Sequence, residues 1–283
     1  MRVLVTGGAG LLGSWLLRTA PPAWELYATQ RHSPVSGAPA HTVELSRARD
    51  VLALWERLRP GLVIHTAYSA GEARRDTWKA THSVVDACEA VGAALIHLST
   101  DALFDGEHGP YDESAEPAPV HEYGEWKARA ELHVRERMPG AAVVRTSLIT
   151  EFAPLDPRSA WVAEALRERK PLSLFVDELR CPITALDLAR QLWEIAALPF
   201  STRAGVWHLA GPEALSRYAL GTLIAAHERL DAAGITPARS ADAPGRRPRD
   251  ARLLTTRADA ALQTRARPIS TLLLPSSLKE STE

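Results

Sequence analysis

RVLVTGGAGLLG, residues 2–13, is a β-branched, strand-like run that leads directly into a glycine-rich turn. Gly7, Gly10 and Gly13 have the G-x-x-G-x-x-G spacing. Glycine is needed there for a tight turn, for close approach of a pyrophosphate and for packing of helix on strand. An apolar helical stretch follows, whose N-terminus offers free N–H groups to phosphates. The stretch predicts a dinucleotide site at Gly7, Gly10, Leu11, Leu12 and Gly13; a plain tight turn is the alternative.

Short β-branched runs and helical stretches alternate through the first half of the chain. The strands are expected at Arg2–Thr6, Glu25–Thr29, Leu62–Thr66, Ala93–Ser99 and Ala141–Thr146. The helices are expected at Gly10–Thr19, Asp50–Leu58, Thr77–Val91 and Tyr123–Arg137. This alternation buries parallel strands between two helix layers, so it predicts a Rossmann-type, doubly wound α/β sheet over residues 1–150.

The alternation becomes less regular after residue 150. Residues 151–283 are expected to form a smaller α/β substrate lobe that is not independent of the sheet, with some crossing of the chain between the two parts. Helices are expected at Ser159–Glu168, Leu186–Leu198 and from Ser216 to about Ala233, and strands at Leu172–Val176 and Val206–Leu209. Residues 239–267 contain eight arginines and three aspartates. This cluster is either a solvated basic face or a clamp for a substrate diphosphate.

Composition limits the classes of function. The 283 residues are 46% hydrophobic and 24% charged, with a formal net charge of −1, which favours neither nucleic acid nor an anionic membrane as a partner. Cys88 and Cys181 lack metal-ligand spacing, and both are expected to be buried thiols. We also expect structural histidines with satisfied ring nitrogens and no metal site. With no signal-peptide pattern and no apolar run of membrane-spanning length, a cytoplasmic protein is expected.

The residues after the second strand bear on which dinucleotide is bound. An acid at that strand's end binds the ribose 2′-OH, whereas an arginine accommodates a 2′-phosphate. Here Gln30-Arg31-His32 follows the strand without a carboxylate. The sequence therefore predicts NADP(H) over NAD(H), with Arg31 in contact with the 2′-phosphate; an ordinary exposed arginine is the alternative.

Tyr123 and Lys127 are four residues apart and fall on one face of a predicted helix. A tyrosine with its usual pKa of ~10 is a poor acid–base catalyst near neutrality, and a nearby positive charge lowers that pKa. We therefore expect Lys127 to tune Tyr123 for carbonyl–alcohol chemistry. The hydroxyl-bearing Ser99-Thr100-Asp101 lies at a strand's carboxyl end, where open α/β sheets bind ligands.

Together these motifs resemble the extended short-chain dehydrogenases/reductases, and most closely the dTDP-4-dehydrorhamnose reductases. The resemblance covers nearly the whole chain. It rests on Thr6–Gly13, His65-Thr66-Ala67, Leu98–Asp101, Phe104-Asp105-Gly106, Pro110–Glu113, Tyr123-Gly124 with Lys127, Val144–Ser147, Asp177–Ile183, Asp187-Leu188-Ala189 and Arg247–Asp250.

The resemblance implies an NADPH-dependent reduction of the ketone of a nucleotide-linked 4-keto-6-deoxyhexose. Tyr123 would give a proton to the ketone oxygen, Lys127 would hold the nicotinamide ribose, and Thr100 would hydrogen-bond the substrate. Thr66 and Ala67 would join the glycine turn in the cofactor site. The remaining expected substrate contacts are Asp101, Trp126, Arg180 and Arg247. A homodimer is compatible with the resemblance.

Three positions depart from the family pattern. Thr77 stands where the superfamily often has asparagine, Ala102 replaces the usual aromatic residue, and the bulky Trp126 replaces a small residue. These departures keep open a non-catalytic NADP-binding regulatory subunit, and a related nucleotide-sugar epimerase is also compatible with the motifs. A dehydratase is disfavoured, because no acidic pair follows Ser99-Thr100-Asp101.

Overall fold

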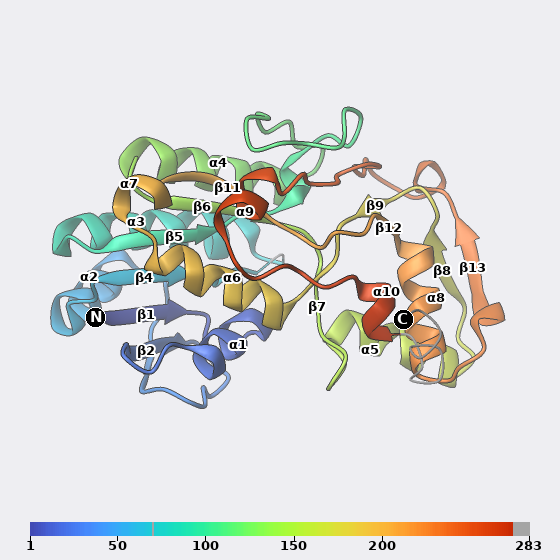
Figure 1. The fold of residues 1–283 in the computed structure, drawn as a ribbon, viewed down its shortest axis with the longest axis horizontal. Helices are drawn as coiled ribbons and strands as arrows, with labels where there is room; N and C mark the ends of the chain where they lie inside the picture. The colour runs from blue at the N-terminus through green and yellow to red at the C-terminus, as the bar shows by residue number, and fades with distance from the viewer. Residues whose placement is uncertain (70, 274–283) are drawn as a thin grey trace.

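The computed structural model describes residues 1–69 and 71–273. Seven parallel strands form its main sheet, in the order β3-β2-β1-β4-β5-β6-β11 (Figure 1). The strands are β1 (Arg2–Thr6), β2 (Glu25–Gln30), β3 (Ala40–Thr42), β4 (Leu62–His65), β5 (Ala94–Leu98), β6 (Ala142–Thr146) and β11 (Gly205–Leu209). The strand order reverses between β1 and β4, and open α/β sheets bind their ligands beyond the carboxyl ends of the strands at such a point.

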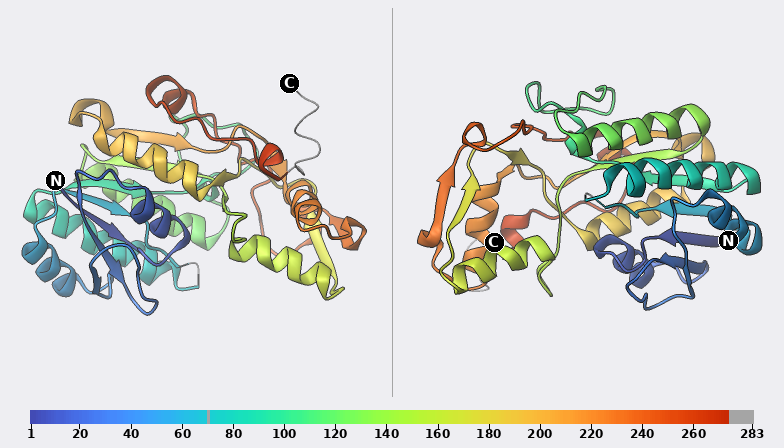
Figure 2. Two further views of the ribbon diagram at one scale, coloured as in Figure 1. Left: turned by 60° about the horizontal axis from the view of Figure 1, so that its bottom comes forward. Right: turned by 180° about the vertical axis from the view of Figure 1, so that it is seen from behind.

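Helices cover both faces of this sheet. One face carries α1 (Leu11–Thr19) and α6 (Ala185–Ala197), and the other carries α2 (Ala48–Leu58), α3 (Ala80–Val91) and α4 (Glu122–Arg137) (Figures 1 and 2). The central strands β4 and β6 are fully buried, as expected for a parallel sheet covered on both sides. The Rossmann-type fold class predicted from the sequence is confirmed.

A smaller lobe lies beyond the carboxyl ends of the strands (Figure 1). Its elements are α5 (Pro157–Arg167), β8 (Leu172–Phe175), α8 (Arg217–His227), β13 (Ile235–Ala238) and α10 (Ile269–Leu273), which share one apolar core. Short paired strands link the two lobes: β7 (Ile149–Thr150) with β10 (Ile183–Thr184), and β9 (Leu179–Arg180) with β12 (Leu215–Ser216).

The chain crosses between the lobes more than once. After residue 150 it builds α5 and β8, returns to the main sheet as α6, α7 (Phe200–Arg203) and β11, and then builds α8 and β13. The last segment returns again as α9 (Thr256–Ala261), which packs near β11, before ending at α10. A boundary at residue 150 therefore does not separate the main sheet from the smaller lobe.

Two expected helices differ from the observed ones. The helix expected from Thr77 begins as a π-helical turn at Arg74–Lys79 and becomes α-helical at Ala80. The helix expected to reach about Ala233 ends at His227, because Arg229 takes a left-handed φ of 56° and turns the chain. The strands β3 and β13 were missed, since both are short and mostly polar or exposed. None of the described helices is long and apolar enough to cross a membrane.

Candidate functional site

The structure gives a different reason for glycine at each of the three positions of the first turn. Gly7 has a φ of +71°, which a side chain disfavours, and a Cβ at Gly13 would lie 2.2 Å from the Gly7 carbonyl oxygen. A Cβ at Gly10 would meet only that oxygen, at 3.2 Å, because Gly10 is exposed at the mouth of the turn. Leu11 is the first residue of α1, and Leu12, the second, has a buried side chain.

The N-terminus of α1 has the donors an anion needs. Gly10 is its N-cap, no side chain caps it, and its first turn carries no acidic residue. The first N–H groups of such a helix have no partner within the helix. The glycine turn therefore combines open space with free backbone donors, which fits a diphosphate.

The end of β4 lies against the same turn. The Thr66 and Ala67 amides donate to the Thr6 hydroxyl at 3.1 and 3.3 Å, and the Thr66 hydroxyl donates to the Thr6 carbonyl at 2.6 Å. A Cβ on Gly7 would be 3.0 Å from the Ala67 Cα. The structure thus brings the sequence-predicted Thr66 and Ala67 to the glycine turn, at the point where the strand order reverses.

Arg31 lies just past β2, as expected, but it has protein partners. Its Nη1 donates to both carboxylate oxygens of Asp76, at 3.0 Å each, and lies 3.6 Å from a carboxylate oxygen of Glu44. Arg75 also donates to Asp76, at 2.7 Å. Arg31 keeps 38% of its side chain exposed, so it reaches solvent while it is paired. The carboxylates Glu44 and Asp76 were missed, because they come from segments distant in sequence.

Tyr123 and Lys127 lie on the first two turns of α4. His121 caps this helix by accepting a hydrogen bond from the Gly124 amide at 2.9 Å. The Lys127 ammonium is buried and donates to the Leu98 carbonyl at 2.5 Å, which ties the helix to the end of β5. The Tyr123 ring, half-buried, lies 5.9 Å from the ring of Tyr68. Sequence reasoning missed Tyr68, which carries no motif.

The electrostatics of this pair differ from the expectation. Burial raises the pKa of Tyr123 well above its usual range, and Tyr68 and Asp101 act in the same direction, while Thr100 and Arg158 act against them. Burial also lowers the pKa of Lys127 to about 8. The prediction that Lys127 lowers the pKa of Tyr123 is therefore wrong for this structure. Desolvation outweighs the effect of any charge nearby.

Thr100 and Asp101 follow β5 and come close to the smaller lobe. The Thr100 hydroxyl accepts from the Ala102 amide at 3.2 Å. Asp101 is buried, accepts from the Ser147 hydroxyl at 2.6 Å and lies 3.6 Å from Arg180. Arg180 is itself buried and donates to two backbone carbonyls. The structure thus places Arg180 as a link between the lobes rather than in the open cavity.

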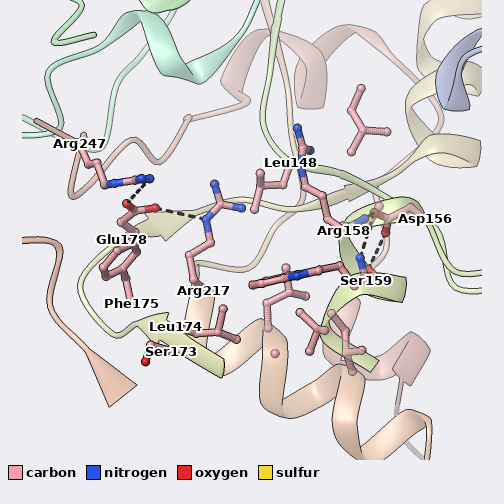
Figure 3. A pocket seen from close by; sticks show the side chains of 17 residues that line it. Leu148, Asp156, Arg158, Ser159, Ser173, Leu174, Phe175, Glu178, Arg217 and Arg247 are labelled. Atoms are coloured by element: carbon pink, nitrogen blue, oxygen red, sulfur yellow. Dashed lines mark hydrogen bonds and ion pairs between the residues drawn. The ribbon is translucent and has the colours of Figure 1, made fainter. Parts of the chain in front are cut away.

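An open cavity of about 320 Å³ lies in the smaller lobe (Figure 3). At one side, Glu178 pairs with both Arg217, at 3.3 Å, and Arg247, at 3.5 Å. Arg158 comes from α5 on the other side of the cavity, and its charge acts on Tyr123. Arg158, Arg217 and Arg247 thus share the cavity with one carboxylate, Glu178, that is not used in capping a helix, because the cavity's other acid, Asp156, caps α5. The cavity is therefore suited to an anionic ligand.

The arginine-rich cluster of residues 239–267 matches neither alternative alone, because it is not simply a solvated basic face and not all of its arginines face the cavity. Of its arginines, Arg247 lines the cavity. Several others hold the segment to the lobe of the main sheet: Arg249 pairs with Glu107, Arg257 donates to carbonyls in and beside β11, and Arg267 pairs with Asp187 of α6. Arg217 and Arg158 were missed by sequence reasoning, since each is a single arginine on an otherwise ordinary helix.

Trp126 lies on α4, on the side of Arg74 and Arg129. Their guanidinium groups are 5.9 and 4.7 Å from its ring, and its indole N–H donates to Glu122. Trp126 does not line the described cavity. Thr77, at the position of the family's usual asparagine, is buried, and its hydroxyl finds no partner among residues 1–69 and 71–273.

The structure confirms the prediction for the cysteines and only part of the prediction for the histidines. Cys88 and Cys181 are both buried free thiols, as expected. His65 is satisfied by Thr6 and Thr81. The expectation of satisfied histidines is wrong for His97, because neither of its ring nitrogens has a partner within the described part of the chain. Burial, reinforced by the Lys127 charge, lowers the pKa of His65 to about 3.

The chain is similar to known proteins over most of its length. A family model described as RmlD substrate binding domain matches residues 1–280. A curated protein of Haloferax volcanii, named a probable low-salt glycan biosynthesis reductase, is 30% identical over 232 residues, which cover 76% of each chain. The methionine adenosyltransferase 2 subunit beta of Pongo abelii is also 30% identical, over 274 residues covering 89% of this chain and 80% of that protein.

One solved structure agrees closely in fold. The crystal structure of a hypothetical dTDP-4-dehydrorhamnose reductase from Sulfolobus tokodaii has a TM-score of 0.82 and 26% sequence identity. The alignment covers 93% of this chain and 96% of that one. The likeness therefore includes both the main sheet and the smaller lobe.

Proposed function

Because this chain belongs to the RmlD substrate binding domain family, we propose that it is an NADPH-dependent reductase of the keto group of a nucleotide-linked deoxysugar. The position of Tyr123 carries the proposal. Its phenol lies where the charges of both Asp101 and Arg158 act on it, and Arg158 lines the cavity of the smaller lobe. A ketone beside Tyr123 would thus belong to a ligand whose remainder extends into that cavity.

Tyr123 holds a proton that a reduction needs. Its raised pKa keeps the phenol protonated near neutral pH but also makes it a weaker acid than an ordinary tyrosine, so it would give its proton only to a strongly basic group such as the alkoxide that develops on the ketone oxygen. The Thr100 hydroxyl, which acts on the same phenol, would help to hold the ketone oxygen. Lys127, close behind them, would bind the nicotinamide ribose. A bound NADPH supplies the hydride to the carbonyl carbon.

The cofactor fits the residues present at the first turn. The uncapped N-terminus of α1, the open space at Gly10 and the adjacent Thr66 and Ala67 would hold the diphosphate and the neighbouring ribose. Arg31 would bind the 2′-phosphate in place of part of its present pairing with Asp76. Arg31 would thereby exchange one ion-pair partner for another.

The substrate's nucleotide would occupy the smaller lobe. Arg217 and Arg247 share one carboxylate, Glu178, so their remaining donors can bind a diphosphate. Trp161 and Phe175 also line the cavity and offer aromatic faces for a base. Relatives named for a reductase and for dTDP-4-dehydrorhamnose support this substrate class.

A direct assay tests the proposal. The purified chain is mixed with NADPH and a panel of dTDP- and UDP-linked 4-keto-6-deoxyhexoses, and NADPH oxidation is followed by absorbance. We expect turnover with at least one sugar, lost in Tyr123→Phe and kept in Tyr27→Phe, a surface tyrosine bonded to Glu25. Consumption that is the same in the Tyr123→Phe variant would refute the assigned acid.

A regulatory subunit of the same fold is the second candidate. The observation that favours it is the 30% identity to a protein named as a subunit of methionine adenosyltransferase. The unusual Thr77 and the bulky Trp126 near the proposed acid agree with it. Tight NADPH binding without turnover on any ketosugar in the panel would favour the regulatory subunit over the reductase.

A further inference from the structure

Two histidines and an aspartate meet on the outer side of α3 and α4, on the sheet face opposite to α1. His82 and Asp86 are one turn apart on α3, and His133 comes from α4. One ligand atom from each, a ring nitrogen or a carboxylate oxygen, lies within 4.8 Å of the other two. None of the three takes part in the site proposed above.

We propose that His82, Asp86 and His133 form a binding site for a divalent transition metal ion of the zinc type, which links α3 to α4. Two imidazoles and one carboxylate are the ligands that Zn²⁺ and its neighbours prefer, whereas Mg²⁺ and Ca²⁺ prefer oxygen ligands alone. Three protein ligands leave a fourth position for water.

The state of His133 is the second observation behind this site. Its side chain is only 9% exposed, and its Nε2 is buried without a hydrogen-bond partner among the residues that the structure describes. A buried ring nitrogen without a partner costs free energy, so such a group calls for an explanation. The ring also stacks on His82, with centroids 3.5 Å apart and planes inclined by 26°.

The site can be reached and can close around an ion. An open hollow of about 330 Å³, lined by Trp78, Lys79, His82 and Asp86 among others, lies beside it. Tetrahedral zinc with bonds of about 2.0–2.1 Å needs ligand atoms roughly 3.4 Å apart. Because the His82 and His133 rings are stacked, their nitrogen lone pairs lie in nearly parallel planes, so His82 must turn out of the stack to share an ion with His133. His82 is half-buried and Asp86 is exposed, which leaves both side chains open to solvent on one side.

Asp86 has one competing partner. Arg137 lies 3.4 Å from its carboxylate and also pairs with Glu89. The ion would take Asp86 from Arg137, which keeps Glu89. This exchange costs little, because exposed ion pairs contribute roughly 0–1 kcal/mol. The Trp78 ring packs against His82, with ring centroids 4.4 Å apart, so one side of this histidine is apolar.

Titration of the metal-stripped full-length chain with ZnCl₂ in a calorimeter tests the site. We expect a single equivalent to bind with a rise in melting temperature, and bound Co²⁺ to show the visible absorption of a low-coordinate nitrogen–oxygen site. MgCl₂ at the same concentration should give neither effect. Binding of Mg²⁺ as tight as that of Zn²⁺, or no binding of Zn²⁺, would overturn the proposal.

Variants locate the ion. His82→Ala and the exposed Asp86→Asn should each weaken Zn²⁺ binding by about tenfold or more, with circular dichroism confirming that they are folded. The matched control is His108→Ala, which removes an exposed histidine paired with Asp105 and should bind as wild type does. Unchanged affinity in both His82→Ala and Asp86→Asn, or an equal loss in His108→Ala, would place the ion elsewhere and end this assignment.

Discussion

Arg31 donates from one guanidinium nitrogen to both carboxylate oxygens of Asp76, at 3.0 Å each. Asp76 in turn is only 6% exposed and also binds Arg75. The arginine expected to choose the cofactor is therefore held in place by a carboxylate from the segment before α3. Such pairing fixes the guanidinium near the end of β2, and it also lowers the net positive charge that a 2′-phosphate would meet.

The first prediction concerns this choice of cofactor. Wild type should bind NADPH about ten to a hundred times more tightly than NADH, since a charge-assisted contact contributes ~1.5–3 kcal/mol. Arg31→Ala should lose this preference, measured by fluorescence titration with each cofactor. Arg47→Ala, an exposed arginine at the start of α2, is the control and should keep it. Equal affinities in wild type would show that Arg31 does not read the phosphate.

A second prediction concerns the glycine turn. Gly10→Val should abolish cofactor binding and leave the fold intact, because a Cβ at Gly10 meets only the Gly7 oxygen within the protein, while the branched side chain would fill the space a diphosphate needs. Calorimetric titration and circular dichroism measure the two effects. Gly13→Val, by contrast, should fail to fold properly, because its Cβ would collide with the backbone of Gly7 and Gly8. Normal NADPH binding by folded Gly10→Val would remove the cofactor from this turn.

The main sheet could be predicted from sequence because its information is local. Buried parallel strands appear as continuous apolar runs, and the glycines of the first turn mark where β1 meets α1. In the smaller lobe α5, β8 and α8 were predicted, but β7, β9, β10 and β12 could not be, since they have two residues each and form only through partners distant in the chain.

The same distinction holds for the site. Tyr123 and Lys127 share one helix, so their spacing was visible in the sequence. The shared pairing of Glu178 with Arg217 and Arg247 joins three separate segments, and nothing local marks it. Desolvation of Tyr123 also depends on packing around it rather than on spacing, which is why the direction of its pKa shift was predicted wrongly.

A third prediction concerns a buried ion pair at the end of β6. Arg145 donates to Glu131 at 2.6 Å, both side chains are almost inaccessible, and the Ser99 hydroxyl donates to the same carboxylate at 2.7 Å. Glu131→Gln should lower the free energy of unfolding by about 3–5 kcal/mol, because it leaves a buried guanidinium without its charge partner. Urea unfolding measures this.

The control for that variant is the double change Glu131→Leu with Arg145→Met. It removes both charges together, so it should cost less than Glu131→Gln alone. If Glu131→Gln unfolds within about 1 kcal/mol of wild type, the pair does not have the burial and charge assigned to it.

A fourth prediction concerns pH. The pKa of Lys127 is lowered by burial from 10.5 to about 8, so the folded chain loses this proton as the pH rises through about 8. Affinity for the anionic NADPH should therefore fall as the pH rises through about 8. Between about pH 8 and 10.5 the unfolded chain holds the proton and the folded chain does not, so the contribution of Lys127 to stability rises with pH there. Titrations at several pH values check the first effect, and Lys127→Met should show neither.

The last prediction separates catalysis from cofactor binding. Tyr123→Phe removes the proton donor and keeps the ring packed against Tyr68, so NADPH affinity should stay nearly unchanged while turnover falls by ~10²–10⁴-fold. Lys127→Ala should reduce both, because it removes a charge beside the ribose and the hydrogen bond to the Leu98 carbonyl that ties α4 to β5. Steady-state rates with an active ketosugar and calorimetric affinities give the two values for each variant. A loss of affinity in Tyr123→Phe equal to its loss of turnover would mean that the phenol holds the cofactor rather than donating the proton, and the acid would then have to be sought among the neighbouring hydroxyls, Thr100 first.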